Sequence, residues 1–151
     1  MPVLLVLNHA PGTSVPAMVA AACEGATSDG LENVEVRAVE ALAVTSADML
    51  AADGYLLATP ANLGYMSGAM KHAFDTTYND VLDLTRGRPF AALVHGESDT
   101  TGALLAITKI TTGLRWRCVM EPVSVIGPVG DDHLAACAEA GAVVAASTLS
   151  L

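Results

Sequence analysis

Short apolar runs alternate with alanine-rich, amphipathic stretches along the whole chain. Val3–Leu7 is a continuous apolar run, and a short run of this kind with β-branched residues predicts a buried strand rather than a helix. A turn follows, and then an alanine-rich stretch over residues 15–26 predicts a helix that Ser28-Asp29-Gly30 ends. The same alternation predicts further strands at residues 34–39, 54–59, 89–94 and 118–126, and further helices at residues 45–52, 67–77, 101–114 and 131–146.

Five strands that alternate with five helices are typical of an α/β domain, in which helices cover both faces of a parallel sheet. Pro60 marks the end of the third strand in this prediction. Pro122 places the fifth strand at an edge or a bulge, because proline cannot donate to the ladder. No linker, repeat or low-complexity segment interrupts the chain, so we expect residues 1–151 to form a single doubly wound domain.

Composition and charge exclude several classes of protein. The sequence is 52% hydrophobic and only 15% charged, which excludes intrinsic disorder. A formal net charge of -9 repels a phosphate backbone, which excludes nucleic acid as a partner. Cys23, Cys118 and Cys137 lie far apart, which argues against a disulfide framework or a metal site, and we expect Cys118 to be a small buried residue. No basic segment precedes the first apolar run, so we expect a cytoplasmic protein with no membrane partner.

In a doubly wound sheet of strand order 2-1-3-4-5, ligands bind beyond the carboxyl ends of strands 1 and 3, where the order reverses. The first of these two loops reads His9-Ala10-Pro11-Gly12-Thr13-Ser14. Gly12 allows close backbone approach, Thr13 and Ser14 offer hydroxyls, and the next helix presents free N–H groups to an anion. The loop has neither the lysine of a Walker loop nor Gly-x-Gly-x-x-Gly, so the expected ligand is a single phosphate monoester. The alternative is that Thr13 or Ser14 only caps the helix.

The second loop, over residues 59–71, has the pattern Thr-Pro-x-x-x-Gly-x-Met-Ser-Gly-x-Met-Lys. This pattern resembles the flavin-contacting loop of the flavodoxin-like NAD(P)H:FMN/quinone oxidoreductases, and most closely their tryptophan-repressor-binding-protein-like branch. Gly12-Thr13-Ser14 is similar to the end of the flavodoxin phosphate signature, although Pro11 removes one N–H from that loop. The resemblance implies a flavodoxin-like three-layer sandwich, with a five-stranded parallel sheet of order 2-1-3-4-5 and helices on both faces. It also implies that FMN is the cofactor, and that the second loop contacts it through Pro60, Ala61, Asn62, Leu63, Gly64, Tyr65 and Met66.

The loop after the fourth strand, His95-Gly96-Glu97-Ser98-Asp99, stands where relatives surround the pyrimidine end of the flavin. The resemblance therefore implies that these residues also contact the cofactor. Glu97 and Asp99 either oppose negative charge on the reduced flavin or are solvated and help to cap the following helix. His9 and His95 both end strands on the ligand side, where each is a candidate contact to phosphate, flavin or substrate, or else a polar rim residue.

The function that the resemblance implies is an FMN-binding oxidoreductase, which takes hydride from NAD(P)H and passes it to a quinone or similar small acceptor. No Ser/His/Asp or Cys/His grouping stands out in the sequence, so we expect the flavin rather than a catalytic side chain to carry the chemistry. Relatives are often dimers or tetramers, which implies a homo-oligomer. Two alternatives stay open: an electron-carrier flavodoxin with a protein redox partner, and a flavodoxin-like domain that has lost FMN and acts as a binding module.

Overall fold

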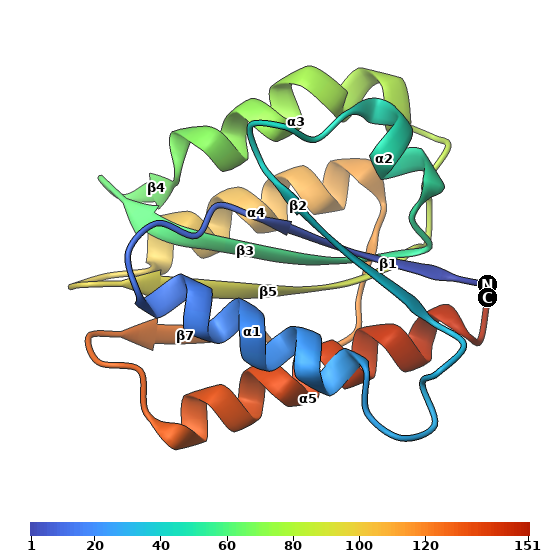
Figure 1. The fold of residues 1–151 in the computed structure, drawn as a ribbon. Coiled ribbons are helices and arrows are strands. Elements are labelled where there is room, and N and C mark those ends of the chain that lie inside the picture. The colour runs from blue at the N-terminus through green and yellow to red at the C-terminus, as the bar shows by residue number, and fades with distance from the viewer.

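The computed structural model describes residues 1–151 and contains one mainly parallel sheet with helices on both faces (Figure 1). The strands are β1 (Val3–Asn8), β2 (Glu35–Glu40), β3 (Gly54–Asn62), β4 (Tyr65–Met66), β5 (Pro89–Gly96), β6 (Arg117–Cys118) and β7 (Val123–Ile126). The helices are α1 (Ser14–Ala26), α2 (Ser46–Ala51), α3 (Gly68–Val81), α4 (Thr101–Leu114) and α5 (Asp131–Thr148).

The order of the strands confirms the predicted flavodoxin-like topology. The parallel strands lie in the order β2-β1-β3-β5, and β6 and β7 share the fifth position by pairing with different parts of β5. The interruption between β6 and β7 contains Pro122, which the sequence placed at an edge or bulge. The structure adds one short strand that was not predicted, β4, which pairs antiparallel with the end of β3.

Three sequence predictions are wrong in detail. β3 does not end at Pro60: Pro60 still pairs with His95 of β5, and the strand continues to Asn62 because β4 pairs with it there. The third helix runs on to Val81, whose buried side chain packs into the core. Cys118 is exposed rather than buried, because β6 is a two-residue edge strand and the Cys118 thiol donates to the carbonyl of Met120 at 3.1 Å.

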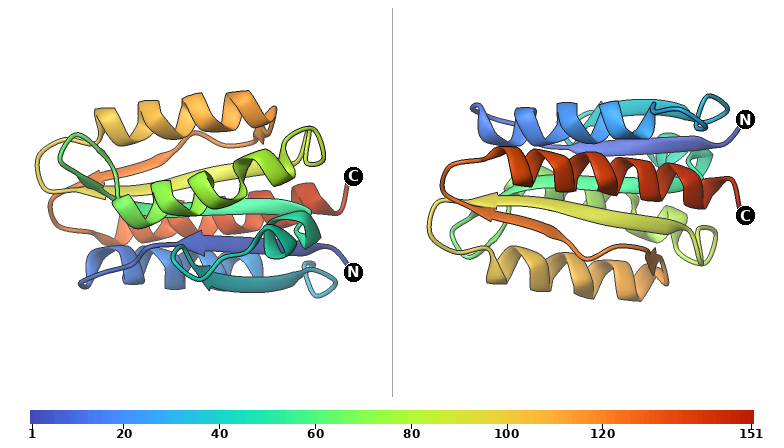
Figure 2. Two further views of the ribbon diagram at one scale, coloured as in Figure 1. Left: turned by 90° about the horizontal axis from the view of Figure 1, so that it is seen from above. Right: turned by 90° about the horizontal axis from the view of Figure 1, so that it is seen from below.

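Two apolar layers hold the helices to the sheet. α1 and α5 lie side by side on one face, and α2, α3 and α4 cover the other (Figures 1 and 2). All six residues of β1 and all eight of β5 are buried, as expected for central parallel strands. Trp116 lies in the second layer, where its ring stacks on Tyr55 with the centroids 3.9 Å apart. No helix in the structure is both long and apolar enough to span a membrane.

Glycines bring α1 and α5 into very close contact. A Cβ atom at Gly25 of α1 would lie 1.9 Å from the carbonyl oxygen of Ala138, and one at Gly141 of α5 would lie 1.9 Å from that of Ala22. Any larger residue at either position therefore requires the two helices to separate. This contact fixes the position of α1, whose first turn lies at the carboxyl edge of the sheet.

Candidate functional site

Three loops that follow β1, β3 and β5 enclose a cavity of about 300 Å³ at the carboxyl edge of the sheet. Its walls come from the start of α1, the end of β3 and the end of β5. The lining residues are Pro11, Gly12, Thr13, Ser14, Val15, Pro60, Ala61, Asn62, His95, Gly96 and Glu97. Most of the candidate residues from the three loops therefore meet in one place, at the point where the strand order reverses.

The start of α1 leaves its hydrogen-bond donors free. The N–H groups of residues 12–15 have no acceptor, and neither hydroxyl of Thr13 and Ser14 forms a hydrogen bond. Thr13 has ψ of -28°, close to helical, whereas capping residues have extended backbone that folds the side chain over the helix end. Thr13 and Ser14 therefore do not cap the helix, and Gly12, with φ of +72°, turns the chain so that these groups face the cavity.

The second loop is a tight hairpin between β3 and β4. Ala61 pairs with Met66 and Asn62 with Tyr65, so Leu63 and Gly64 form the two-residue turn. Their φ angles of +51° and +78° fit the turn type that matches strand twist, although a leucine is strained in this conformation. Leu63 is fully exposed at the tip, whereas Met66 is buried in the core.

Side chains anchor the hairpin at its base. The backbone N–H of Ser67 donates to the hydroxyl oxygen of Thr59 at 3.1 Å, and the Ser67 hydroxyl accepts from the N–H of Met70 and caps α3. At the tip, the Gly64 carbonyl lies so close to Gly102 of α4 that a Cβ there would be 1.7 Å from the oxygen. Pro60, Ala61 and Asn62 line the cavity, whereas Leu63, Gly64, Tyr65 and Met66 do not.

The third loop divides its polar side chains between two roles. His95 is buried at the cavity wall, and its Nε2–H donates to the carbonyl of Gly127 at 2.7 Å. Glu97 also lines the cavity, but Ser98 and Asp99 do not. The Asp99 carboxylate accepts from the N–H of Thr101 at 3.0 Å and from its hydroxyl at 2.7 Å, and these bonds lower the pKa of Asp99. Asp99 thus fills the capping role that the sequence left open.

His9 lies away from the other candidate residues. Its backbone N–H donates to the carbonyl of Ala58 at 2.9 Å, and its side chain lines a separate cavity of about 200 Å³ together with Glu40 and Leu42. The Nδ1 atom of His9 is buried there with no hydrogen-bond partner. One lining residue that sequence reasoning missed is Val15, which contributes a free backbone N–H rather than a recognisable side chain.

The electrostatics of the cavity favour a phosphate monoester bound by neutral donors. No lysine or arginine lines it, and Glu97 is its only acidic residue. The four free N–H groups, two hydroxyls and the positive end of the α1 dipole lie together at the start of α1, where their residues line the cavity. Elsewhere in the chain, no group of three or more His, Cys, Asp or Glu side chains is placed to hold a metal ion.

Comparisons with known proteins agree with this geometry. The family model described as NADPH-dependent FMN reductase matches residues 17–129. Similar solved structures include a flavodoxin from Archaea (21% identity, 99% of both chains covered, TM-score 0.80) and an oxidoreductase from Corynebacterium diphtheriae (20% identity, 100% and 98% covered, TM-score 0.78). Another is a WrbA-like flavodoxin from Agrobacterium tumefaciens (16% identity, 99% of both chains covered, TM-score 0.76). Among curated proteins, none has a matching sequence. The structural likenesses establish the fold, and the family match includes the second and third loops.

Proposed function

Because the chain belongs to the NADPH-dependent FMN reductase family, we propose that it binds FMN and passes hydride from NADH or NADPH to a quinone or similar small acceptor. The observation that carries this proposal is the unpaired set of donors at the start of α1, which faces the cavity between the three loops. The family model does not reach this first loop, so the donors are independent support for a phosphate-bearing cofactor.

The lining residues fit the parts of FMN. The N–H groups of residues 12–15, with the hydroxyls of Thr13 and Ser14, would hold the terminal phosphate. The β3–β4 hairpin would lie along the ring system, and residues 95–97 would lie near its polar end. A Cβ at Gly96 would lie 2.7 Å from the carbonyl of Asp99, so this loop folds tightly and exposes backbone toward the cavity.

When bound, FMN supplies the two-electron chemistry, so the chain itself needs no nucleophile or general acid. The residues of the chain position the cofactor and exclude water from one of its faces. His95 keeps a fixed ring orientation because its Nε2–H donates to the carbonyl of Gly127.

We also propose a cytoplasmic location, where reduced nicotinamides are available. We further propose a homodimer or homotetramer, which light scattering of the purified protein would establish.

The second candidate is an electron-carrier flavodoxin that serves a protein partner. A net charge of -9 favours it, because electron carriers commonly dock through complementary charge. The two candidates differ in their reaction: an oxidoreductase oxidises NAD(P)H in the presence of a small acceptor, whereas a carrier does not. A third candidate, a binding module without flavin, differs from both in failing to bind FMN.

One titration and one assay separate these candidates. FMN is titrated into the purified protein and followed by quenching of flavin fluorescence, with riboflavin and FAD as controls. We expect FMN to bind more tightly than either, because only FMN places a phosphate monoester at the start of α1. Oxidation of NADH and NADPH is then measured with benzoquinone. Equal affinity for FMN and riboflavin would remove the phosphate site from the proposal, and flavin binding without NAD(P)H oxidation would favour the electron carrier.

A further inference from the structure

A second cavity lies on the far side of the β3–β4 hairpin from the proposed cofactor cavity. It has a volume of about 330 Å³ and is formed between the tip of the hairpin and the outer surface of α4. Its lining residues are Gly64, Tyr65, Gly102, Leu105, Ala106, Lys109 and Ile110. The hairpin is thus a wall common to both cavities, with Asn62 lining one and Tyr65, its partner across the turn, lining the other.

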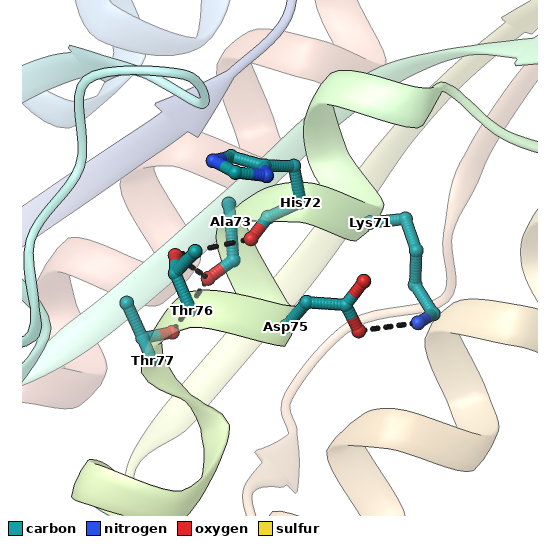
Figure 3. Close-up of polar contacts among 6 residues, drawn as sticks. All are labelled: Lys71, His72, Ala73, Asp75, Thr76 and Thr77. Carbon is teal, nitrogen blue, oxygen red and sulfur yellow. Dashed lines mark hydrogen bonds and ion pairs between the residues drawn. The ribbon is translucent and has the colours of Figure 1, made fainter.

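Lys109 is the only basic residue that lines any of the cavities in the structure. It is exposed and forms no ion pair. Three of the other six basic residues are paired with carboxylates, as Figure 3 shows for Lys71 and Asp75. Arg88 donates to backbone carbonyls at the end of α2, and Arg115 and Arg117 lie at the amino end of β6, opposite the cofactor edge.

Exposed apolar side chains line the same cavity as this lysine. Tyr65 is 40% exposed and Leu105 is 54% exposed, and both line the cavity. Leu63, next to them at the tip of the turn, is fully exposed. Burying an aromatic ring and aliphatic side chains at such a surface is favourable, and an aromatic ring beside a cation suits a planar ligand that carries negative charge.

We propose that this cavity is the subsite for the adenine and pyrophosphate part of the nicotinamide donor, with Lys109 contacting the phosphates. The inference rests on the proposed function. The reacting nicotinamide must enter the cofactor cavity, so the rest of the dinucleotide must lie outside it, and the hairpin is the wall that separates the two. A chain with net charge -9 repels this anionic part, and Lys109 is the one cavity-lining cation that offsets the repulsion.

The test compares FMN-loaded wild-type protein with Lys109→Gln, Lys109→Glu and a control, Arg117→Gln. The control removes one positive charge at the opposite end of the sheet. With NADH or NADPH as donor and benzoquinone as acceptor, we expect Lys109→Gln to raise the donor KM about threefold at low salt with kcat unchanged, as for loss of an exposed ionic contact. Lys109→Glu should raise it further, and high salt should reduce both effects.

Three additional measurements keep the outcomes distinct. The KM for 1-benzyl-1,4-dihydronicotinamide, which has no phosphates, should be the same in all four proteins. Binding of ADP-ribose, measured by calorimetry in the absence of turnover, should weaken in Lys109→Gln.

Two results would overturn the subsite. One is a KM increase that also occurs in Arg117→Gln or with the uncharged donor, and the other is unchanged ADP-ribose binding in Lys109→Gln. A shift in oligomeric state in Lys109→Glu with unchanged donor KM would assign the surface to a second copy of the chain instead. Failure of every donor to reduce the flavin, with ADP-ribose binding intact, would overturn the proposed function alone.

Discussion

The first turns of α1 and α4 lie at the same edge of the sheet but treat their backbone donors in opposite ways. At α4, Asp99 accepts from both the N–H and the hydroxyl of Thr101, so the chain supplies its own anion. At α1, the donors of residues 12–15 have no partner, and the first turn contains no acidic residue. Neither N-cap residue, Thr13 nor Thr100, makes a capping bond, so the difference comes from the carboxylate.

The remaining three helices each have a capping side chain or a carboxylate at their first turn. Thr45 and Asp48 form a reciprocal pair at α2, and Ser67 caps α3. At α5 no N-cap side chain caps the helix, but Asp131 and Asp132 place two carboxylates in its first turn. A missing cap costs about 1 kcal/mol of stability. α1 alone has neither a capping bond nor a carboxylate at its first turn, and it is the helix end that lines the cavity between the three loops. Under the proposed function, the open end of α1 is where the phosphate of FMN would bind.

A carboxylate introduced at the first turn of α1 should make this helix end resemble that of α4, with its donors occupied by the chain itself. We expect Thr13→Asp to reduce FMN affinity at least a hundredfold, because a carboxylate about 4 Å from a phosphate charge costs roughly 4 kcal/mol at an effective dielectric of 20. The neutral variant Thr13→Asn is the matched control and should stay within about tenfold of wild type. Fluorescence titration measures both. Similar affinities for the two variants would show that no phosphate lies at this helix end.

Removing one hydroxyl should weaken the cofactor without weakening the fold. Ser14→Ala should cost about 1–3 kcal/mol of FMN binding, because hydrogen bonds to charged acceptors are strong. The melting temperature of the flavin-free protein should not change, since the Ser14 hydroxyl makes no bond within the chain. Ser67→Ala is the opposite case: loss of the α3 cap should destabilise the fold by about 1 kcal/mol. Titration and thermal melts of both variants test this contrast.

Substitutions of the two acidic residues of the third loop should have different effects on the flavin midpoint potential. Glu97 lines the cavity, so Glu97→Gln should raise the flavin midpoint potential by on the order of 20–40 mV, through loss of repulsion toward the reduced, more negative cofactor. Asp99→Asn should leave the potential within about 10 mV, since Asp99 faces α4. A larger shift in Asp99→Asn than in Glu97→Gln would contradict this division.

The smallest expected effect is a pH dependence of stability at α4. The pKa of Asp99 is lowered in the folded protein, so its contribution is fully present above the ordinary aspartate pKa and is lost as the pH falls through the lowered value. Asp99→Asn should therefore melt at a lower temperature than wild type at pH 7, and the two should converge on acidification. Thermal melts between neutral and acidic pH measure the difference, with Glu97→Gln as the control.

The sequence predicted the helices and strands because apolar runs and alanine-rich stretches have different lengths and periods, and the resemblance carried by the second loop supplied the strand order. The sequence did not predict the β3–β4 hairpin, since leucine does not normally adopt positive φ. Leu63 does so here because the strands on either side of the turn pair through Ala61 with Met66 and Asn62 with Tyr65. The sequence identified the candidate residues by the loop that contains them. Membership of a loop does not determine the direction of each side chain. Glu97 and Asp99 are two residues apart, yet one lines the cavity and the other caps a helix.

The contact between α1 and α5 has a consequence for the order in which the protein is made. α1 is synthesised well before α5, because α1 ends at Ala26 and α5 begins at Asp131. Until residues 131–148 have been synthesised, the face of α1 that contains Gly25 has no partner, and the first turn of α1 is not fixed. Capture of the proposed cofactor is therefore expected only after α5 has been synthesised, so the chain depends on free FMN being present from that point on.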